Sequence, residues 1–276
     1  TLDNSGLTEA DLIRRMVGRT LEPVEALDAG ALAGQPVALR IEGMSLPGAF
    51  EDMRLEARRG EIVGIFGLEG SGAEEFSRGV FGLVPPITGR VEVLGKPVHD
   101  LAPAASMARG MSYLTGNRKE AGLYMDRSIA DNVTARVLDR RSRFGFVDAR
   151  AIEAQAREDI RRFAIRAPSP ESLPRQLSGG NQQKVLVSAC LASAPEVIIL
   201  NEPTRGVDVG AKAEVHDVAR REAAAGRALV VFSSDLPELL RLAHRIVVMR
   251  SRRHAGEVAG REMSEESVMA LAAGGH

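Results

Sequence analysis

Residues 61–81 read EIVGIFGLEGSGAEEFSRGVF, and this stretch joins an apolar run, a glycine-rich turn and a helical segment. The apolar run Glu61–Phe66 is short and ends at a glycine, as buried strands do. The turn Gly67–Glu74 leads into a predicted helix at Ala73–Phe81. A strand, a glycine-rich turn and a helix in this order are typical of a phosphate-binding loop, in which backbone N–H groups and the helix N-terminus face an anion. Taken alone, the stretch is equally compatible with an ordinary glycine-rich turn.

The turn departs from the phosphate-loop pattern G-x-x-x-x-G-K-[ST] at its last two positions. Counted from Gly67, Gly72 is the second glycine, Ala73 stands at the lysine position and Glu74 at the Ser/Thr position. The lysine would bring a cation to the phosphates, and the hydroxyl would bind Mg²⁺. Losing a charge-assisted contact of roughly 1.5–3 kcal/mol lowers affinity about tenfold or more, so the loop is expected to bind a nucleotide poorly.

Other short apolar runs recur along the chain, each bounded by glycine, proline or polar residues. Helical stretches at Ala149–Phe163 and Gly180–Ser193 lie between some of them. This alternation predicts an α/β fold with a mainly parallel sheet and helices on both faces. The segments Leu39–Ile41 and Val91–Val98 are predicted antiparallel additions. The further strands are predicted at Met111–Leu114, Val197–Leu200, Leu229–Ser233 and Ile246–Met249.

The composition excludes several classes of protein. Of 276 residues, 36 are basic and 37 acidic, and a net charge of -1 argues against a nucleic-acid binder. The single cysteine, Cys190, cannot form an intrachain disulfide, which favours a reducing compartment. Neither an 18-residue apolar run nor a signal peptide is found, so a membrane link is expected through a partner protein. The five histidines lack metal-ligand spacing, so we predict no metal site and expect them at surface or partly buried positions.

The first 36 residues differ in pattern from the rest of the chain. Residues 8–11 can cap a short helix whose apolar face includes Leu12 and Met16, and Ala29–Pro36 is typical of a linker. Such a helix must pack against something. It either docks on this same domain or belongs to a domain that precedes it.

A second motif, LSGGNQQKV, occupies residues 177–185. Ser178 can cap a helix, and Gly179 and Gly180 would expose N–H groups at the N-terminus of that helix. The alternative is a plain capped helix, but so specific a run favours an anion site.

A third motif, VIILNEPT at residues 197–204, is an apolar strand that ends in a polar pair. Ligands of α/β sheets bind at the carboxyl ends of the strands. Asn201 stands where an aspartate usually holds Mg²⁺ through water, and its neutral amide is a weaker metal partner. Glu202 retains a carboxylate that is able to polarise an attacking water. The alternative is a polar strand end without chemistry.

Together these motifs resemble the ATP-binding cassette (ABC) family of transport ATPases over about Val37–Ser251. Ser178 and Asn201 are 23 positions apart (201 − 178), as in that family, and residues 205–212, RGVDVGAK, look like the loop that crosses a cassette dimer. LSGGNQQK combined with NEPTRGVDVGAK is similar to the ATP-binding subunits of bacterial ribose, xylose and galactose importers, which carry two cassettes in one chain. The resemblance implies a P-loop NTPase-like α/β fold.

The resemblance also implies a division of the chain. Residues 9–19 look like the last helix of a first cassette, so residues 1–36 are expected to be the tail of that cassette plus a linker. Residues 37–276 would then be a second, C-terminal nucleotide-binding domain with a helical subdomain at about 118–180.

In the head-to-tail dimer that the family implies, each ATP lies between the phosphate loop of one cassette and the signature of the other. The family's loop glutamine aligns with Gly116 and its switch histidine with Ser234. Residues expected at this cassette's own nucleotide are Gly67, Gly70, Ser71, Gly72, Ala73, Glu74 and Asn201, with Glu202 and Ser234 at the catalytic positions. Residues expected at the partner's nucleotide are Ser178, Gly179, Gly180 and Gln182, and the dimer-crossing loop comprises Arg205, Gly206, Val207 and Asp208.

The altered positions all face this cassette's own nucleotide. We therefore expect the C-terminal cassette of a monosaccharide importer's ATP-binding subunit. This cassette alone would be weak or inactive in hydrolysis, while its signature completes a site for ATP and Mg²⁺ on a partner cassette. Expected partners are that first cassette, transmembrane permease subunits and, indirectly, a periplasmic sugar-binding protein, at the cytoplasmic face of the bacterial inner membrane. The alternative is a nucleotide-independent structural or regulatory module. A chromosome-organising cassette is excluded, because only 105 positions (178 − 73) separate loop and signature and no heptads are sustained.

Overall fold

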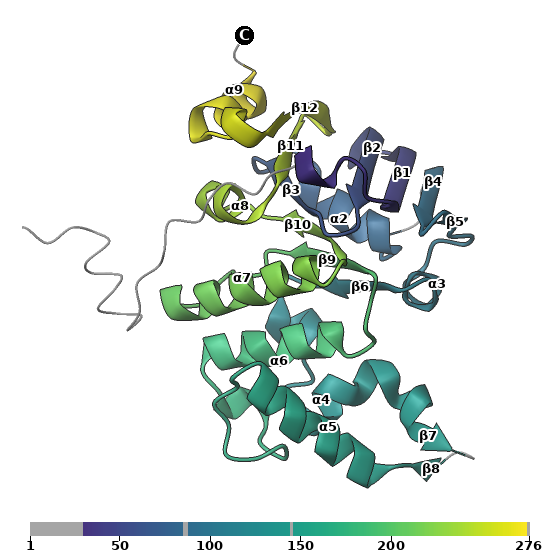
Figure 1. The fold of residues 1–276 in the computed structure, drawn as a ribbon, viewed down its shortest axis with the longest axis vertical. Helices are drawn as coiled ribbons and strands as arrows, with labels where there is room; N and C mark the ends of the chain where they lie inside the picture. The colour runs from purple at the N-terminus through teal and green to yellow at the C-terminus, as the bar shows by residue number, and fades with distance from the viewer. Residues whose placement is uncertain (1–29, 85–87, 144–145, 275–276) are drawn as a thin grey trace, which may run out of the picture.

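Strand β3 (Ile62–Gly67), which precedes the glycine-rich turn, lies within a six-stranded sheet. The computed structural model describes residues 30–84, 88–143 and 146–274. β3 pairs in parallel with two strands, β10 and β11, and β12 forms an antiparallel edge. This confirms the predicted α/β class with a mainly parallel sheet (Figure 1). The other strands, in spatial order, are β12 (Arg253–Ala259), β11 (Arg245–Arg250), β10 (Ala228–Phe232), β9 (Val197–Asn201) and β6 (Met111–Leu114).

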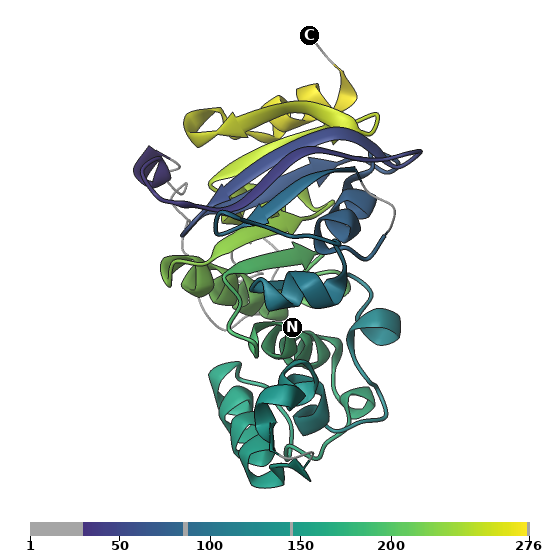
Figure 2. The same ribbon diagram turned by 90° about the vertical axis from the view of Figure 1, so that its right-hand side faces the viewer.

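A second sheet of four antiparallel strands shares a core with helix α2 (Ala73–Phe81) and with the main sheet. Figure 2 places both sheets in the upper half of the molecule. The predicted antiparallel additions are confirmed. One strand of this sheet, β2, was not predicted, although its residues FEDMRLEAR alternate in burial, and neither was β12 of the main sheet. The strands are β2 (Phe50–Arg58), β1 (Val37–Leu46), β4 (Thr88–Val93) and β5 (Lys96–Pro97), in that spatial order.

Between β6 and β9 the described chain is mostly helical and forms the lower half of the molecule (Figures 1 and 2). Helix α6 packs against α4 and α7 and connects this region to the sheet. The elements are η2 (Arg118–Gly122), α4 (Ile129–Thr134), η3 (Ala135–Arg141), the β7 (Ser142–Arg143) and β8 (Phe146–Val147) hairpin, α5 (Ala149–Arg162), η4 (Pro174–Gln176) and α6 (Gly179–Leu191). Elsewhere lie η1 (Gly30–Leu32), α3 (Pro103–Ala108), α7 (Val209–Ala224), α8 (Leu236–Leu242), η5 (Gly260–Glu262) and α9 (Glu265–Ala273).

The helix predicted near the N-terminus, at residues 8–19, lies outside the described residues. Of the linker predicted at Ala29–Pro36, the part from residue 30 onward is described, and it holds only the single turn η1. Among the described helices, none has the length and apolar character needed to cross a membrane.

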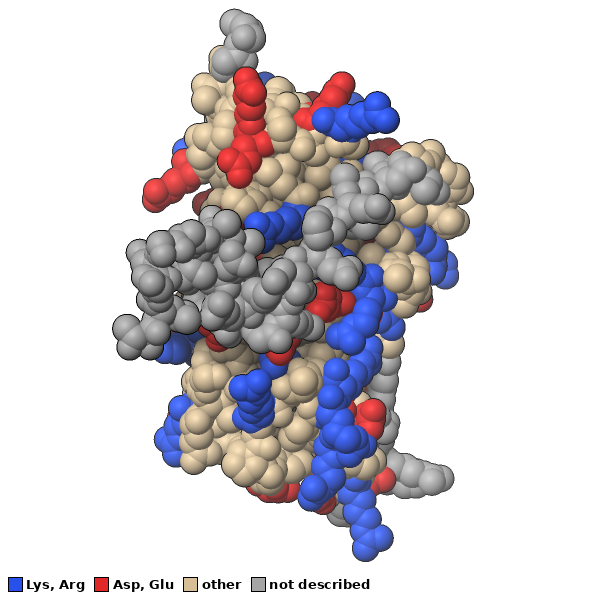
Figure 3. All heavy atoms as spheres, turned by 60° about the vertical axis from the view of Figure 1, so that its left-hand side comes forward, with Lys and Arg blue, Asp and Glu red and all other residues tan. Residues whose placement is uncertain are grey.

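Lys and Arg side chains gather in a band over the lower half of the face in Figure 3. Several arginines of α5 and α7 have acidic partners within the chain: Arg157 pairs with Glu153, Arg162 with Glu222, and Arg220 with Asp217. Part of the basic charge on these helices is therefore neutralised by nearby acidic side chains.

Phe76 of α2 joins three elements of the core and provides a test of the fold. Its fully buried ring packs edge-on against Phe50 of β2 and Phe232 of β10, with ring centroids 5.4 and 5.8 Å away. We expect Phe76→Ala to lower the free energy of unfolding by about 3–5 kcal/mol, because it leaves a cavity between both sheets. Urea unfolding measures the loss. Met269→Ala, at an exposed position, should cost less than about 0.5 kcal/mol, and equal costs would contradict this account of the core.

Candidate nucleotide cleft and partner-facing turn

A cleft of about 1180 Å³ lies at the carboxyl ends of β3, β9 and β10. The pairing of parallel strands places Phe232 level with both Ile65 and Asn201, so the ends of the three strands meet there. The cleft brings together all the residues predicted at this chain's own nucleotide, together with Glu202 and Ser234. It is lined by residues 67–75, Tyr113, residues 115–117, Asn201, Glu202, Phe232, Ser233, Ser234 and the arginines Arg78, Arg136 and Arg205, among others.

The glycine-rich turn is closely packed against its surroundings. Gly72 is the N-cap of α2 with φ 89°, and a Cβ built there would lie 2.3 Å from the carbonyl oxygen of Ala49. Only glycine fits such a left-handed, crowded position. The N–H of Ser71 donates to the carbonyl of Leu68 at 2.9 Å. α2 then begins with half-buried Ala73 and exposed Glu74, which puts a methyl group and a carboxylate at the mouth of the turn.

Asn201 at the end of β9 is buried, and its side chain is already engaged. Its Nδ2 donates to the hydroxyl of Tyr113 at 2.9 Å, and that hydroxyl lies 3.3 Å from Oγ of Ser77. Burial raises the pKa of the Tyr113 phenol, although both hydrogen bonds work in the opposite direction, so the group stays neutral at ordinary pH. The hydroxyl of Tyr113 thus links Asn201 to Ser77.

Glu202 is held toward the position of the family's switch histidine. Its carboxylate Oε1 accepts a hydrogen bond from the backbone N–H of Ser234 at 2.8 Å. The backbone of Glu202 is left-handed, with φ 47°, which is strained for a residue with a side chain. Gly116 lies against it, and a Cβ built on Gly116 would come within 2.9 Å of the Glu202 Cβ. A glutamine side chain at position 116 could therefore enter only if this contact opened.

A buried polar network lies behind the cleft. Glu238 of α8 accepts hydrogen bonds from the hydroxyl of Thr204 at 2.7 Å and from that of Ser233, and it contacts Nε2 of His216 at 2.8 Å. Sequence reasoning gave no role to Glu238 or to Tyr113 and expected His216 at a surface or partly buried position, whereas the structure buries it. No sequence signal links these residues, because their partners lie as far as 88 positions away.

The residues predicted to face a partner's nucleotide lie outside this cleft, in a separate turn. Ser178 is the N-cap of α6, as predicted, and its side chain accepts from Asn181. Gly180 packs on the next element, because a Cβ built there would lie 2.8 Å from Cβ of Ala211. Asp208 caps α7 in the same neighbourhood by accepting from the N–H of Ala211 at 3.0 Å. The structure thus places the predicted signature beside the predicted crossing loop.

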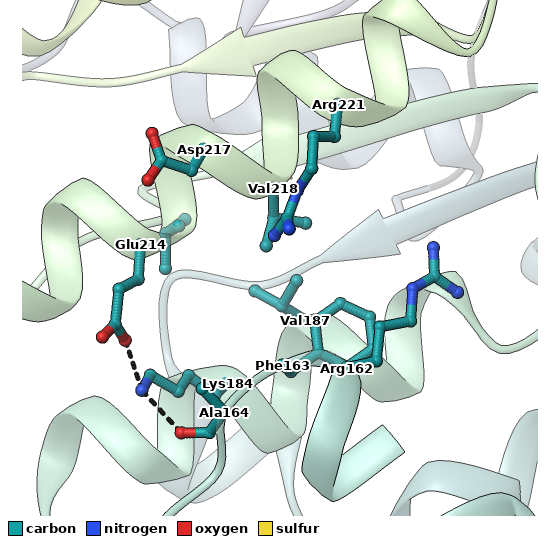
Figure 4. A pocket seen from close by; sticks show the side chains of 10 residues that line it. Arg162, Phe163, Ala164, Lys184, Val187, Glu214, Asp217, Val218 and Arg221 are labelled. Carbon is teal, nitrogen blue, oxygen red and sulfur yellow. Dashed lines mark hydrogen bonds and ion pairs between the residues drawn. The ribbon is translucent and has the colours of Figure 1, made fainter. Parts of the chain in front are cut away.

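Helix α6 is docked on α7 by a buried cation. Lys184 donates to the carbonyl oxygen of Ala164 at 2.9 Å and forms an ion pair with Glu214. Figure 4 shows this pair at one side of a cavity of about 210 Å³, whose wall includes Phe163 and Val187. The second turn of α6 is therefore held against α7 by contacts that do not involve the N-terminus of the helix.

The histidines and acids of the described ranges include no group of three or more that could hold a metal ion. His244, which is also buried, accepts instead from the backbone N–H of Ile62 at 3.0 Å.

The fold and this cleft define a nucleotide-binding cassette of the P-loop type. A family profile for ABC transporters matches residues 50–205, and the chain belongs to that family. It is 42% identical to the ribose import ATP-binding protein RbsA 2 of Rhizobium etli, over 97% of this chain and 53% of that protein. It is 37% identical to the ribose import ATP-binding protein RbsA of Bacillus subtilis, over 100% of this chain and 56% of that protein. The chain thus spans about half the length of the curated relatives it matches.

Solved structures with the same fold include two cassettes of low sequence identity. One is a nucleotide-free ATP-binding cassette from an ABC transporter, with a TM-score of 0.72 and 17% identity over 84% of this chain and 95% of that one. The other is a dimeric bacterial ABC transporter cassette, with a TM-score of 0.67 and 22% identity over 80% of this chain and 98% of that one.

The residues of the cleft and those of the turn at the α6 N-terminus differ in how well they fit the family's ligand, Mg-ATP. In the cleft the glycine turn could cradle phosphates, but Glu74 would face them and the amide of Asn201 is turned to Tyr113. Glu74 and Asn201 are therefore the two positions of the cleft that do not favour Mg-ATP. The α6 N-terminus, with Gly179 and Gly180 free of side chains, fits a phosphate group by its N–H groups and dipole.

The network around Glu238 predicts a pH-dependent stability. Burial works to raise the pKa of Glu238, but the hydrogen bonds of His216 and Ser233 outweigh it and the pKa is lowered. A lowered pKa in the folded state adds stability above the ordinary glutamate pKa of about 4.3, and this stability is lost as the pH falls through the folded-state value. Glu238→Gln should therefore cost about 1–3 kcal/mol at pH 6–7 and progressively less below about pH 4.

Urea unfolding of wild type and variant across pH 3–7 measures this difference. Ser233→Ala, which removes one hydrogen bond to the carboxylate, should have a smaller cost with the same pH trend. A cost of Glu238→Gln that stays constant over the whole range would contradict the assigned role of the carboxylate.

Proposed function

We propose that this chain is the C-terminal cassette of the ATP-binding subunit of a bacterial monosaccharide importer, and that its own phosphate loop is degenerate. The proposal is carried by one observation: the altered positions belong to the cleft, whereas the turn Ser178–Gly180 is unaltered. Ala73, Glu74, Asn201 and Ser234 replace the cation, the hydroxyl, the acid and the imidazole of an active site. The turn Ser178–Gly180, by contrast, keeps its capping serine and both glycines.

In a head-to-tail pair this chain contributes the turn Ser178–Gly180, with Gln182, to ATP and Mg²⁺ bound on the phosphate loop of a first cassette. Bound Mg-ATP supplies the energy of hydrolysis, and the residues of this chain orient the terminal phosphate through N–H groups. The loop Arg205–Asp208 crosses between the cassettes. The cleft of this chain then binds nucleotide weakly and hydrolyses it slowly or not at all.

Relatives about twice as long, named as ribose import ATP-binding proteins, support an importer subunit with two cassettes. Residues 1–36 would be the tail of the first cassette plus the linker, and residues 37–276 the second cassette, with its helical subdomain at about 118–180. The subunit would bind transmembrane permease subunits at the cytoplasmic face of the inner membrane. A periplasmic sugar-binding protein would act with it indirectly.

One observation favours a second candidate, a structural or regulatory module that works without nucleotide. Two polar groups of the cleft already have partners within the protein, Asn201 with Tyr113 and Glu202 with Ser234. The two candidates differ in whether the turn Ser178–Gly180 is needed for ATP turnover in the assembled transporter.

Binding of Mg-ATP to this chain tests the degenerate loop. We expect no binding detectable by calorimetry at millimolar ATP. The double variant Ala73→Lys with Glu74→Ser should gain at least about tenfold in affinity, because it restores a cation and a metal-binding hydroxyl. Glu75→Ser is the matched control, since it removes an exposed acid from the same turn without restoring either group. Micromolar binding by the wild type, or no gain in the double variant, would count against the proposal.

Turnover of the assembled transporter tests the role of the signature. Ser178→Arg should lower ATP turnover by about 100-fold or more, because a bulky cation fills the turn that faces the partner's phosphate. Ser264→Arg is the control. Ser264 is likewise an exposed N-cap serine, that of α9, and turnover should not change. Unchanged turnover in the Ser178 variant would favour the nucleotide-independent module.

A further inference from the structure

The guanidinium group of Arg118 joins three segments that are far apart in the chain. Arg118 begins η2, directly after the segment that lines the cleft at residues 115–117. Its Nη1 donates to the carbonyl oxygen of Arg205 at 2.7 Å, and its Nη2 donates to that of Gly206 at 3.0 Å. Its Nε donates to Oε1 of Gln182 at 3.3 Å. One half-buried side chain thus contacts both the crossing loop and the signature helix.

Two glycines shape the place where the guanidinium lies. Gly206 has φ 67°, a left-handed conformation that favours glycine. A Cβ built on Gly179 would lie 3.0 Å from Nη2 of Arg118 and 3.3 Å from the carbonyl oxygen of Gly206. The signature turn therefore comes close to both the crossing loop and the guanidinium of Arg118 at Gly179, and a side chain there would crowd both.

Gln182 extends this link to the start of the signature. Its Nε2 donates to the carbonyl oxygens of Pro174 at 3.1 Å and Leu177 at 3.2 Å. These bonds orient the amide so that Oε1 is left to accept from Arg118. Arg118 thus reaches the backbone on both sides of Ser178, through Gln182 on one side and through contact with Gly179 on the other.

The planar guanidinium of Arg118 is needed to donate to its three acceptors at the same time. Three acceptors in three directions match the fixed donors of a guanidinium, whereas an ammonium group at the end of a lysine cannot reach all three at once. The docking of α6 on α7 does not depend on this guanidinium, because the ion pair of Lys184 with Glu214 holds the next turn of the helix (Figure 4).

We propose that Arg118 is the positioning residue that fixes the signature turn Ser178–Gly180 relative to the dimer-crossing loop Arg205–Asp208. The inference rests on the proposed function, since these are the two elements with which this chain would meet the partner cassette and its nucleotide. Arg118 itself is not among the residues that line the cleft. It holds the two elements at one spacing, so that both engage the partner together.

Amide hydrogen exchange of this chain tests the positioning directly, without any partner. The amides of Gln182 and Val207, which bond to Ser178 and Thr204, should exchange at least about tenfold faster in Arg118→Gln and Arg118→Lys. Amides of the later turns of α6 should be unchanged. Lys119→Gln is the matched control, because it removes an exposed neighbouring charge. Unchanged exchange at Gln182 and Val207, or faster exchange along all of α6, would overturn the inference.

Steady-state ATP hydrolysis by the assembled transporter separates this inference from the proposed function. We expect Arg118→Lys to lower kcat at least about tenfold with little change in KM, because ATP remains bound on the partner's phosphate loop while the signature is misplaced. Lys119→Gln should retain wild-type kcat. If Ser178→Arg abolishes turnover but Arg118→Lys does not lower it, the positioning role is wrong and the proposed function stands. If neither variant alters turnover, the proposed function fails as well.

Discussion

The parallel pairing of β10 with β3 on one side and β9 on the other is the constraint on which the rest of the structure depends. Phe232 of β10 is level with Ile65 of β3 and with Asn201 of β9, so the three strands end at one edge. Their residues are almost all buried, and a shift of register by one residue would turn core side chains to the wrong face. The glycine turn, the pair Asn201–Glu202 and Ser234 are consequently brought to one cleft from positions up to 167 residues apart (234 − 67).

The sequence was sufficient for those features that depend on local pattern. The apolar runs predicted the strands of the parallel sheet, and Ser178 was identifiable as a helix cap because a cap acts on its own first turn. Strand β2 was missed, since charged residues interrupt its apolar positions. The hydrogen bonds of Tyr113 to Asn201 and of Arg118 to the crossing loop span 88 and 87 positions, and only the fold reveals them.

The two polar regions of the chain differ in how their hydrogen-bonding groups are used. In the cleft, the buried amide of Asn201 donates to Tyr113, and the half-buried carboxylate of Glu202 accepts from the N–H of Ser234. A ligand would have to break such bonds before making its own. At the α6 N-terminus, Ser178 accepts from the N–H and the side-chain amide of Asn181, and these hydrogen bonds are exposed, so an anion there would not have to break a buried pair of this kind.

The strained backbone of Glu202 connects these two regions. A left-handed residue with a side chain costs about 1–3 kcal/mol and persists only where its surroundings fix it. Here its N–H donates to the carbonyl of Phe232 at 2.8 Å, and its carbonyl accepts from the N–H of Arg205 at 3.2 Å. The strained residue thus turns the chain from β9 into the crossing loop, whose carbonyls Arg118 then holds. The strain at Glu202 is therefore tied to the direction in which the chain leaves β9.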